Sequence, residues 1–248
     1  MHLLDVTLDT PAANLALDEA LLVACEEGGP DVLRFWECPA YFVVVGYSNV
    51  VATEVNVEEC HKRNVPIFRR CSGGGTVLQG PGCLNYSLIL NFETSGTEIL
   101  LSTQPDHAAL QTISGANCYI MRRHAQALRT ALGRDVEVRG ITDLAIGDRK
   151  FSGNAQRRKR RALIFHGTFL LDFDLELVSR LLAKPSKEPD YRVGREHGNF
   201  VMNLNVGAAL IKKALRETWG AREEKFRLPD VKPLVVEKYS RDDWNLKF

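Results

Sequence analysis

The sequence predicts a mixed α/β (α+β) fold in which strands run in hairpins and helices flank them. Helical and β-rich segments are interspersed along 248 residues, without regular βαβ units. No internal repeat, low-complexity tract or Pro/Ser-rich linker divides the chain, which favours a single domain. Hydrophobic residues make up 45% and charged residues 25%, as expected of a globular protein that buries a full core.

The first elements are predicted to be a helix and two strands. Thr10 fits an N-cap and Pro11 the first helical turn, and apolar residues continue at helical spacing from there. Segments 32–37 and 41–46 are rich in β-branched and aromatic residues and are separated by Cys-Pro-Ala. We therefore expect these two strands to pair with each other.

The middle of the chain predicts two more strands and a long helix. Segment 65–70 is a strand that leads two arginines into a run of glycines. Segment 84–91 alternates as a half-buried strand does. A helical segment follows over 104–132, closed by Gly133, and Gly115 marks a candidate break within it.

The second half predicts a meander of strands followed by helices. Segment 136–140 is a strand, 143–153 a tight hairpin turning at Gly147-Asp148, and 162–172 a further strand. The remaining elements are a short helix capped by Asp174, a loop over 184–198 and a final helix over 206–219.

Charge and cysteine usage exclude several classes of protein. Thirty-two Lys and Arg residues stand against thirty-one Asp and Glu, so no overall field attracts nucleic acid or an anionic membrane. The six cysteines are scattered without a CxxC pair. The N-terminus lacks the basic and apolar regions of a signal peptide, and no apolar run reaches the length of a membrane span. We expect a cytoplasmic protein with reduced thiols.

The glycine run that begins at Gly73 is the most informative local feature. Adjacent glycines allow positive φ and let a ligand lie directly on backbone amides, although a tight turn is the simpler interpretation. Arg69 and Arg70 enter this run and offer forked donors to carboxylate or phosphate oxygens. Strand alternation allows only one of them to face a site. The other is expected to meet solvent or an acidic neighbour.

Two blocks of sequence carry a resemblance to a known family. Residues 69–77 with Gly82 resemble the signature of the lipoate–protein ligase A family, within the biotin/lipoate protein ligase catalytic-domain superfamily. Residues 142–156 and 166–172 resemble the segment of that family that carries its catalytic lysine and the strand that follows. Smaller matches lie at 14–19, 46–49, 54–56 and 238–245. The resemblance spans nearly the whole chain in the same order.

The resemblance implies a fold, an activity and partners. The fold is a single biotin/lipoate-ligase-like catalytic domain over residues 1–248, with mixed and antiparallel sheets and no separate C-terminal accessory domain. The implied activity uses ATP and Mg2+ to convert lipoate or octanoate to an acyl-adenylate, and then acylates a lysine of a lipoyl domain. The implied acceptors are acyltransferase subunits of 2-oxoacid dehydrogenases or the glycine cleavage H protein. A separate accessory subunit is a further implied partner.

The resemblance also assigns site residues. Lys150 matches the family's catalytic lysine, and its ammonium would offset negative charge between the adenylate phosphate and the acyl oxygen. Arg70 would contact the acyl carbonyl or phosphate. Asp143 would bind Mg2+ or orient Lys150. The other predicted substrate and adenylate contacts are Ser72, Gly73, Gly74, Gly75, Thr76, Val77, Ser152 and Gly153.

A histidine and a basic loop have two interpretations each. His166 suits a general base, but a histidine on a strand more often satisfies a structural hydrogen bond, and we favour packing. The run 156–161 is either a solvated hairpin tip or a surface that steers an acidic lipoyl domain, and nucleic-acid binding is a weaker option. The candidate acceptor contacts in this run are Arg157, Arg158, Lys159 and Arg160.

Departures from the family pattern leave two alternatives open. Several family ligases have a histidine-aspartate pair where this chain has Gln79 and Gly80. An octanoyltransferase of the same superfamily would need no ATP but would need a nucleophilic thiolate near the lysine. No cysteine lies in 136–141 or after Cys118, and we interpret Cys71 and Cys83 as buried and inert. The second alternative is a non-catalytic subunit that binds the lipoyl carrier.

Overall fold

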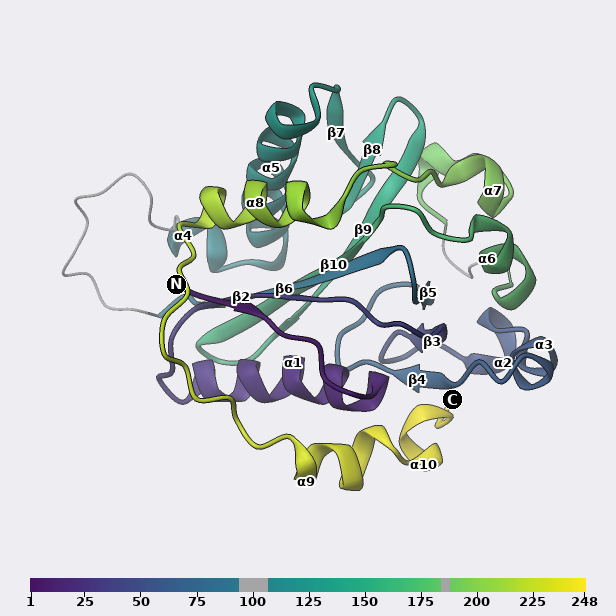
Figure 1. Ribbon diagram of the computed structural model, residues 1–248, viewed down its shortest axis with the longest axis horizontal. Coiled ribbons are helices and arrows are strands. Elements are labelled where there is room, and N and C mark those ends of the chain that lie inside the picture. The colour runs from purple at the N-terminus through teal and green to yellow at the C-terminus, as the bar shows by residue number, and fades with distance from the viewer. Residues whose placement is uncertain (94–106, 184–187) are drawn as a thin grey trace.

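The computed structural model describes residues 1–93, 107–183 and 188–248, which form two β-sheets wrapped by helices (Figure 1). The larger, seven-stranded sheet has the order β1-β2-β6-β10-β9-β8-β7. Its β1–β2 pair is parallel and its other pairs are antiparallel. Its strands are β1 (His2–Asp5), β2 (Val32–Trp36), β6 (Cys83–Asn91), β7 (Val136–Arg139), β8 (Asp143–Ile146), β9 (Arg149–Arg158) and β10 (Ala162–Leu170).

The smaller sheet is three-stranded, in the order β4-β3-β5. Its strands are β3 (Phe42–Val45), β4 (Ile67–Arg69) and β5 (Val77–Gln79). The β3–β4 pair is parallel and the β3–β5 pair antiparallel. The mixed α/β architecture predicted from the sequence is therefore confirmed.

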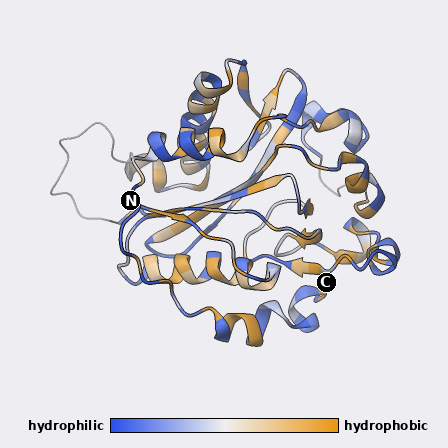
Figure 2. Cartoon of the chain, viewed as in Figure 1, coloured by the Kyte–Doolittle hydropathy of each residue, from blue (hydrophilic) through white to orange (hydrophobic). Residues whose placement is uncertain are grey.

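Helices cover both faces of the larger sheet. Helices α5 and α8 lie on one face, and α1 with the C-terminal helical segment lies on the other (Figure 1). Hydrophobic and hydrophilic residues alternate along these helices, as expected of helices with one buried side (Figure 2). The helices are α1 (Pro11–Glu26), α2 (Val51–Glu54), α3 (Val57–Lys62), α4 (His107–Leu110), α5 (Ile113–Leu132), α6 (Leu175–Leu181), α7 (His197–Phe200), α8 (Ala208–Trp219), α9 (Lys232–Leu234) and α10 (Asp242–Asn245), with a 3-10 turn η1 (Asp190–Arg192) and a π-helical turn η2 (Val235–Tyr239).

Local signals in the sequence located the ends of several elements correctly. The Thr10 hydroxyl caps α1 by accepting a hydrogen bond from the Ala13 amide at 3.1 Å. Gly133 ends α5 in the left-handed conformation, with φ of 60°. Gly147 turns the β8–β9 hairpin at φ of 61°, and Asp174 caps α6.

The expected pairing of the strands at 32–37 and 41–46 was wrong. β2 pairs with β1 and β6 in the larger sheet, whereas β3 pairs with β4 and β5 in the smaller one. The intervening Cys-Pro-Ala segment therefore carries the chain from one sheet to the other instead of closing a hairpin. β6 is also buried on both faces rather than half-buried, because helices cover the sheet on each side.

Two long predicted segments are subdivided in the structure. Residues 104–106 of the predicted helix lie outside the described residues, and the remainder is split into α4 and α5. Thr112 starts α5 by accepting a hydrogen bond from the Gly115 amide at 3.0 Å. In the predicted loop 184–198, residues 184–187 are outside the described residues, and the rest contains η1 and the start of α7. Within the described ranges, no helix is long and apolar enough to cross a membrane.

The two faces of the larger sheet differ in polarity. The face toward α5 and α8 carries apolar side chains, represented by Leu88 on β6 and Phe165 on β10, in a continuous core. The opposite face, toward α1 and the smaller sheet, carries Asn85, His166 and Thr168 on the same two strands. The polar face is where the candidate site lies.

Candidate active site

A cavity of about 680 Å³ lies between the polar face of the larger sheet and the smaller sheet. Both sequence blocks that carry the family resemblance reach it, although they are about 70 residues apart in the chain. Segment 188–201 contributes a further wall. Of the predicted site residues, those that line the cavity are Arg70, Gly74, Gly75, Thr76, Val77, Asp143, Lys150, Ser152 and Gly153. Ser72 and Gly73 are not among the lining residues.

Lys150 is held in the cavity by a carboxylate. Its Nζ lies 2.8 Å from Asp143 Oδ1, across the β8–β9 hairpin. The other carboxylate oxygen, Asp143 Oδ2, accepts a hydrogen bond of 2.9 Å from the Tyr191 hydroxyl. Burial and the charge of Asp143 raise the pKa of Tyr191, so its hydroxyl remains a donor at neutral pH. Lysine, aspartate and tyrosine thus form one chain of contacts that fixes the ammonium.

Tyr191 was missed at the sequence level. It lies in η1, inside a segment predicted only as a loop, and 48 residues separate it from Asp143. No spacing or periodicity in the sequence connects the two residues, because the contact depends on how the segment returns to the sheet.

Arg70 is buried and stabilises the glycine loop. Its guanidinium donates to the carbonyl oxygens of Gly73 and Gly75, each at 2.7 Å from Nη2. Burial lowers the pKa of Arg70 to about 10, which still leaves it charged at neutral pH. In this arrangement the arginine shapes the cavity wall, and the direct substrate contact expected of it stays a prediction.

The glycines give the wall its shape. Gly74 has φ of +87°, a backbone conformation that residues with a side chain rarely adopt. At Gly75, an added Cβ would meet no atom within 4 Å, so the space beside this backbone is open toward the cavity. A ligand can therefore approach the main chain closely at this point.

Arg69 does not meet solvent or form the expected pair with an acidic side chain. It is fully buried and donates to the carbonyl oxygens of Gly46 and Asn49 at 2.8 Å and of Trp244 at 3.1 Å. A guanidinium group carries five N–H donors in one plane, so it can donate to several carbonyl oxygens at once. Arg69 therefore ties the C-terminal segment to the smaller sheet and takes no part in the cavity lining.

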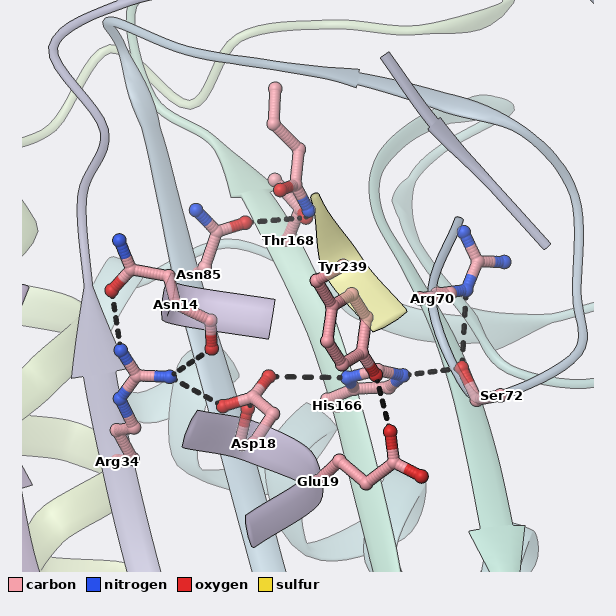
Figure 3. Close-up of polar contacts among 12 residues, drawn as sticks. Asn14, Asp18, Glu19, Arg34, Arg70, Ser72, Asn85, His166, Thr168 and Tyr239 are labelled. Atoms are coloured by element: carbon pink, nitrogen blue, oxygen red, sulfur yellow. Dashed lines mark hydrogen bonds and ion pairs between the residues drawn. The ribbon is translucent and has the colours of Figure 1, made fainter. Parts of the chain in front are cut away.

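His166 belongs to a polar network at the cavity wall, whose contacts Figure 3 shows. Its Nε2 lies 2.6 Å from Ser72 Oγ, and its Nδ1 lies 3.5 Å from Asp18 Oδ2. Arg70 Nε donates to Ser72 Oγ, which leaves the serine hydrogen free to point at the histidine. Ser72 is 1% exposed and lies outside the cavity lining, whereas His166 and Asp18 are part of that lining. The packing role expected of His166 stays a prediction.

Asp18 anchors this network to helix α1. Its carboxylate pairs with Arg34 at 2.6 Å and accepts a hydrogen bond of 2.7 Å from Ser87. Burial alone would raise the pKa of Asp18, but the Arg34 guanidinium brings that pKa below its ordinary value. The network fixes the beginning of the glycine loop relative to α1 and the larger sheet.

None of the six cysteines, all within the described ranges, lines the cavity. Cys71 and Cys83 are buried, as expected. Burial raises the pKa of Cys71 to about 12 and that of Cys83 further still, so both are protonated at neutral pH. Cys118 is exposed on α5, on the other side of the larger sheet.

The described residues do not form a metal site by themselves. Among them there is no cluster of three His, Cys, Asp or Glu side chains that suits an ion. Both oxygens of Asp143 are engaged, by Lys150 and Tyr191. This geometry favours orientation of Lys150 over metal binding as the role of Asp143.

The basic loop is partly used within the molecule. Arg157 donates to the Cys71 carbonyl at 2.6 Å, and Arg158 donates to the Leu110 carbonyl at 2.7 Å. Lys159 and Arg160 lie at the turn between β9 and β10, and the Arg160 side chain is exposed. Fewer basic side chains are therefore available to a partner than the sequence suggests.

Known proteins with similar sequences include both ligases and transferases. The chain is 28% identical over 264 residues to octanoyltransferase LipM of Halalkalibacterium halodurans, covering 96% of this chain and 95% of that one. It is 24% identical over 261 residues to lipoate-protein ligase A subunit 1 of Thermoplasma acidophilum, covering 96% and 94%. A relative from Aeropyrum pernix, named for lipoate-protein ligase A, is 32% identical over 182 residues, and the match spans 61% of its length.

Solved structures share the fold. A bi-partite lipoate protein ligase from Thermoplasma acidophilum, described with its E2 lipoyl domain, aligns with a TM-score of 0.78 at 23% identity, covering 99% of this chain and 95% of that one. A lipoate-protein ligase A bound with ATP aligns with a TM-score of 0.74 at 24% identity, covering 99% and 98%. The model of the lipoyl protein ligase A/B catalytic domain matches residues 10–208. This chain therefore belongs to the lipoyl protein ligase A/B catalytic-domain family.

Proposed function

We propose that this chain is an ATP-dependent lipoate– or octanoate–protein ligase, which activates its acid as acyl-AMP and transfers the acyl group to a lysine of a lipoyl domain. The observation that carries the proposal is an ammonium group, Lys150, fixed by Asp143 in a cavity that no thiol lines among the described residues. A carboxylate is a poor electrophile, and a fixed positive charge beside it suits formation of a mixed anhydride.

The reaction has two steps. In the first, a carboxylate oxygen of the acid forms a bond to the α-phosphorus of ATP, and the bond to pyrophosphate breaks. In the second, an uncharged lysine amine of the acceptor attacks the acyl carbon, the bond to AMP breaks, and the nitrogen loses a proton to solvent. Mg2+ prefers phosphate oxygens and water to a cage made by protein alone, so the phosphates of ATP would hold it and it would offset part of their negative charge.

The residues of the chain have distinct tasks in these steps. Lys150 offsets the negative charge that develops between the phosphate and the acyl oxygen. Asp143 and Tyr191 hold the ammonium in place. Arg70 keeps the Gly73 and Gly75 carbonyls turned toward itself, so that the glycine backbone keeps its shape against the substrate.

The acceptor protein is proposed to dock near the β9–β10 turn. Lys159 and Arg160 remain at the surface there, while Arg157 and Arg158 are engaged by the chain's own carbonyls. A local positive surface raises the rate of encounter with an acidic partner. The E2 lipoyl domain and the subunit named in two relatives motivate assays with a lipoyl domain, with and without an accessory subunit.

A second candidate is an ATP-independent octanoyltransferase. It is favoured by the LipM relative, which is covered over 95% of its length. The mechanism requires a thiolate within reach of the acyl group. The buried positions and raised pKa values of Cys71 and Cys83 argue against it.

Acyl transfer to a lipoyl domain separates the two functions. The purified chain is assayed with octanoate and ATP, and separately with an octanoyl carrier protein without ATP. We expect transfer only with ATP, and we expect Cys118→Ser, at the exposed cysteine, to retain it. Transfer without ATP that disappears in a folded Cys71→Ser or Cys83→Ser variant would establish the transferase. Absence of both nucleotide binding and transfer would indicate a carrier-binding subunit.

A further inference from the structure

The glycine loop, residues 72–76, packs against a segment of the chain that the proposed chemistry does not use. The Asn49 side-chain amide donates to the Gly74 carbonyl at 3.1 Å. A Cβ built on Gly46 would lie 2.0 Å from the same carbonyl oxygen, so only a glycine allows this approach. Segment 46–49 therefore lies directly against the backbone of the loop.

Glu54, the last residue of α2, connects this segment to the far end of the loop. It is 4% exposed and lines the cavity. Its Oε2 atom accepts hydrogen bonds from the Thr76 hydroxyl at 2.5 Å and from the Asn49 side-chain amide at 2.6 Å. The same Asn49 nitrogen donates to Gly74. One carboxylate oxygen thus holds the loop at two residues, directly at Thr76 and through Asn49 at Gly74.

The direction of these hydrogen bonds follows from the groups that make them. The Gly74 carbonyl can only accept, so a turned-over Asn49 amide would set oxygen against oxygen. The Asn49 side chain has two amide hydrogens, and each has an acceptor, the Gly74 carbonyl and the Glu54 carboxylate. The orientation of Asn49 is therefore fixed by its surroundings.

The buried carboxylate is balanced by a nearby cation. Burial of a carboxylate is costly unless the group is hydrogen-bonded and a positive charge lies near it. Burial lowers the pKa of Arg70, and the charge of Glu54 acts on that pKa in the opposite direction. Arg70 itself donates to the Gly73 and Gly75 carbonyls. The loop is therefore held by a cation and by an anion at different residues.

We propose that Glu54 is a positioning residue for acyl-adenylate formation, which fixes the glycine loop against the substrate through Thr76 and Asn49. Its task is to hold the loop, and it takes no part in the bonds that form and break. A displacement of about 1 Å in a group that positions reactants can cost about a hundredfold in rate. The inference deepens the proposed function and rests on it, because the loop needs an adenylate to act upon.

Single substitutions separate the hydrogen bonds of Glu54 from its charge. Glu54→Ala removes both, and kcat for acyl-AMP formation should fall by about a hundredfold, with a smaller change in KM for octanoate. Glu54→Gln keeps an oxygen that can accept from both donors, and should recover most of the lost rate. Glu58→Gln, at an exposed glutamate of α3, is the matched control and should keep the wild-type kcat.

A double variant tests whether Thr76 acts through Glu54. Thr76→Val removes one of the two contacts and should lower kcat by about tenfold. Glu54→Ala/Thr76→Val should lose no more activity than Glu54→Ala alone. Additive losses would contradict the assignment, because Thr76 would then act independently. A wild-type kcat in a folded Thr76→Val variant would also contradict it, even if Glu54→Ala failed to fold.

Hydrogen exchange reports on the loop without any catalytic step. Exchange of the backbone amides in residues 72–76, followed by mass spectrometry, should be faster in Glu54→Ala than in the wild-type chain. Exchange in α5, on the other side of the larger sheet, should be the same in both. Unchanged exchange of the loop in folded Glu54→Ala would overturn the inference.

The two readouts together separate the inference from the proposed function. Faster loop exchange in Glu54→Ala, with no acyl-AMP from the wild-type chain, would uphold the hold of Glu54 on the loop and reject the ligase. Equal acyl-AMP formation by the wild-type and Glu54→Ala chains would uphold the ligase and reject the positioning role.

Discussion

The two faces of the seven-stranded sheet are made by alternate residues of the same strands, yet they serve different purposes. On β10, Phe165 and Phe169 point into the core beneath α5 and α8, while His166 and Thr168 point toward the cavity. One face is filled with apolar side chains, and the other is filled with polar side chains that are tied to α1 or open onto the cavity. Stability therefore depends mainly on the first face and activity on the second, and substitutions should separate the two.

The largest effect on activity is expected at Lys150. Lys150→Ala removes the ammonium from the cavity, and acyl transfer should fall by about a thousandfold, the scale expected for loss of a preorganised electrostatic group. The melting temperature should change little, because the side chain is 25% exposed. Arg149→Ala removes an exposed neighbouring charge and is the control. Near-normal turnover in Lys150→Ala would remove this residue from the mechanism.

The largest effect on stability is expected on the apolar face. Phe165→Ala should lower the free energy of unfolding by about 3–5 kcal/mol, because a fully buried ring is lost and a cavity remains. Chemical denaturation followed by circular dichroism measures this change. The fraction that remains folded should retain its specific activity. A loss of specific activity larger than the loss of folded protein would show that the two faces are not separable.

Acidification should act through a histidine on the apolar side. His124 accepts a hydrogen bond from the Trp219 indole at 2.9 Å, and burial lowers its pKa from 6.5 to about 3. The unfolded chain binds the proton more readily, so stability present above pH 6.5 is lost as the pH falls toward 3. His197, whose pKa burial lowers to about 4, adds to the same trend.

The free energy of unfolding measured across this pH range checks the expectation. His124→Gln retains an acceptor for Trp219 and should reduce the slope without abolishing it. An unchanged slope would show that His124 does not titrate with unfolding.

The smallest effect is expected at Tyr191. Tyr191→Phe removes one hydrogen bond to Asp143 and leaves the ring, so transfer should fall by about tenfold. A positioning role predicts a lower kcat with little change in KM for the acid. It also predicts that the double variant Tyr191→Phe/Asp143→Ala loses no more activity than Asp143→Ala alone. Additive losses in the double variant would mean that Tyr191 acts independently of Asp143.

Sequence patterns predicted what depends on neighbouring residues. The Thr10 cap and the turn at Gly147 each follow from short-range chemistry, and each is where it was expected. The pairing of β2 with β6 instead of β3 was not predicted, because strand propensity does not identify a strand's partner.

The site was predicted unevenly for the same reason. Lys150 and Asp143 stand in one hairpin, and the resemblance marked both. Tyr191 reaches Asp143 from a distant segment, and Gln79 meets Thr168 only because the two sheets face each other. Arg69 and Arg70 are adjacent in sequence, but Arg70 binds carbonyls of the glycine loop that directly follows it, whereas Arg69 binds carbonyls that only the tertiary structure brings near.

Acyl-AMP formation in the absence of any acceptor tests the central claim most directly. The chain is incubated with ATP, Mg2+ and either octanoate or lipoate, quenched, and analysed by mass spectrometry for the adenylate together with released pyrophosphate. We predict equal amounts of acyl-AMP and pyrophosphate from the wild-type chain and neither from Lys150→Ala. A folded wild-type chain that forms no acyl-AMP, yet moves an octanoyl group from a carrier protein to a lipoyl domain without ATP, would contradict the account.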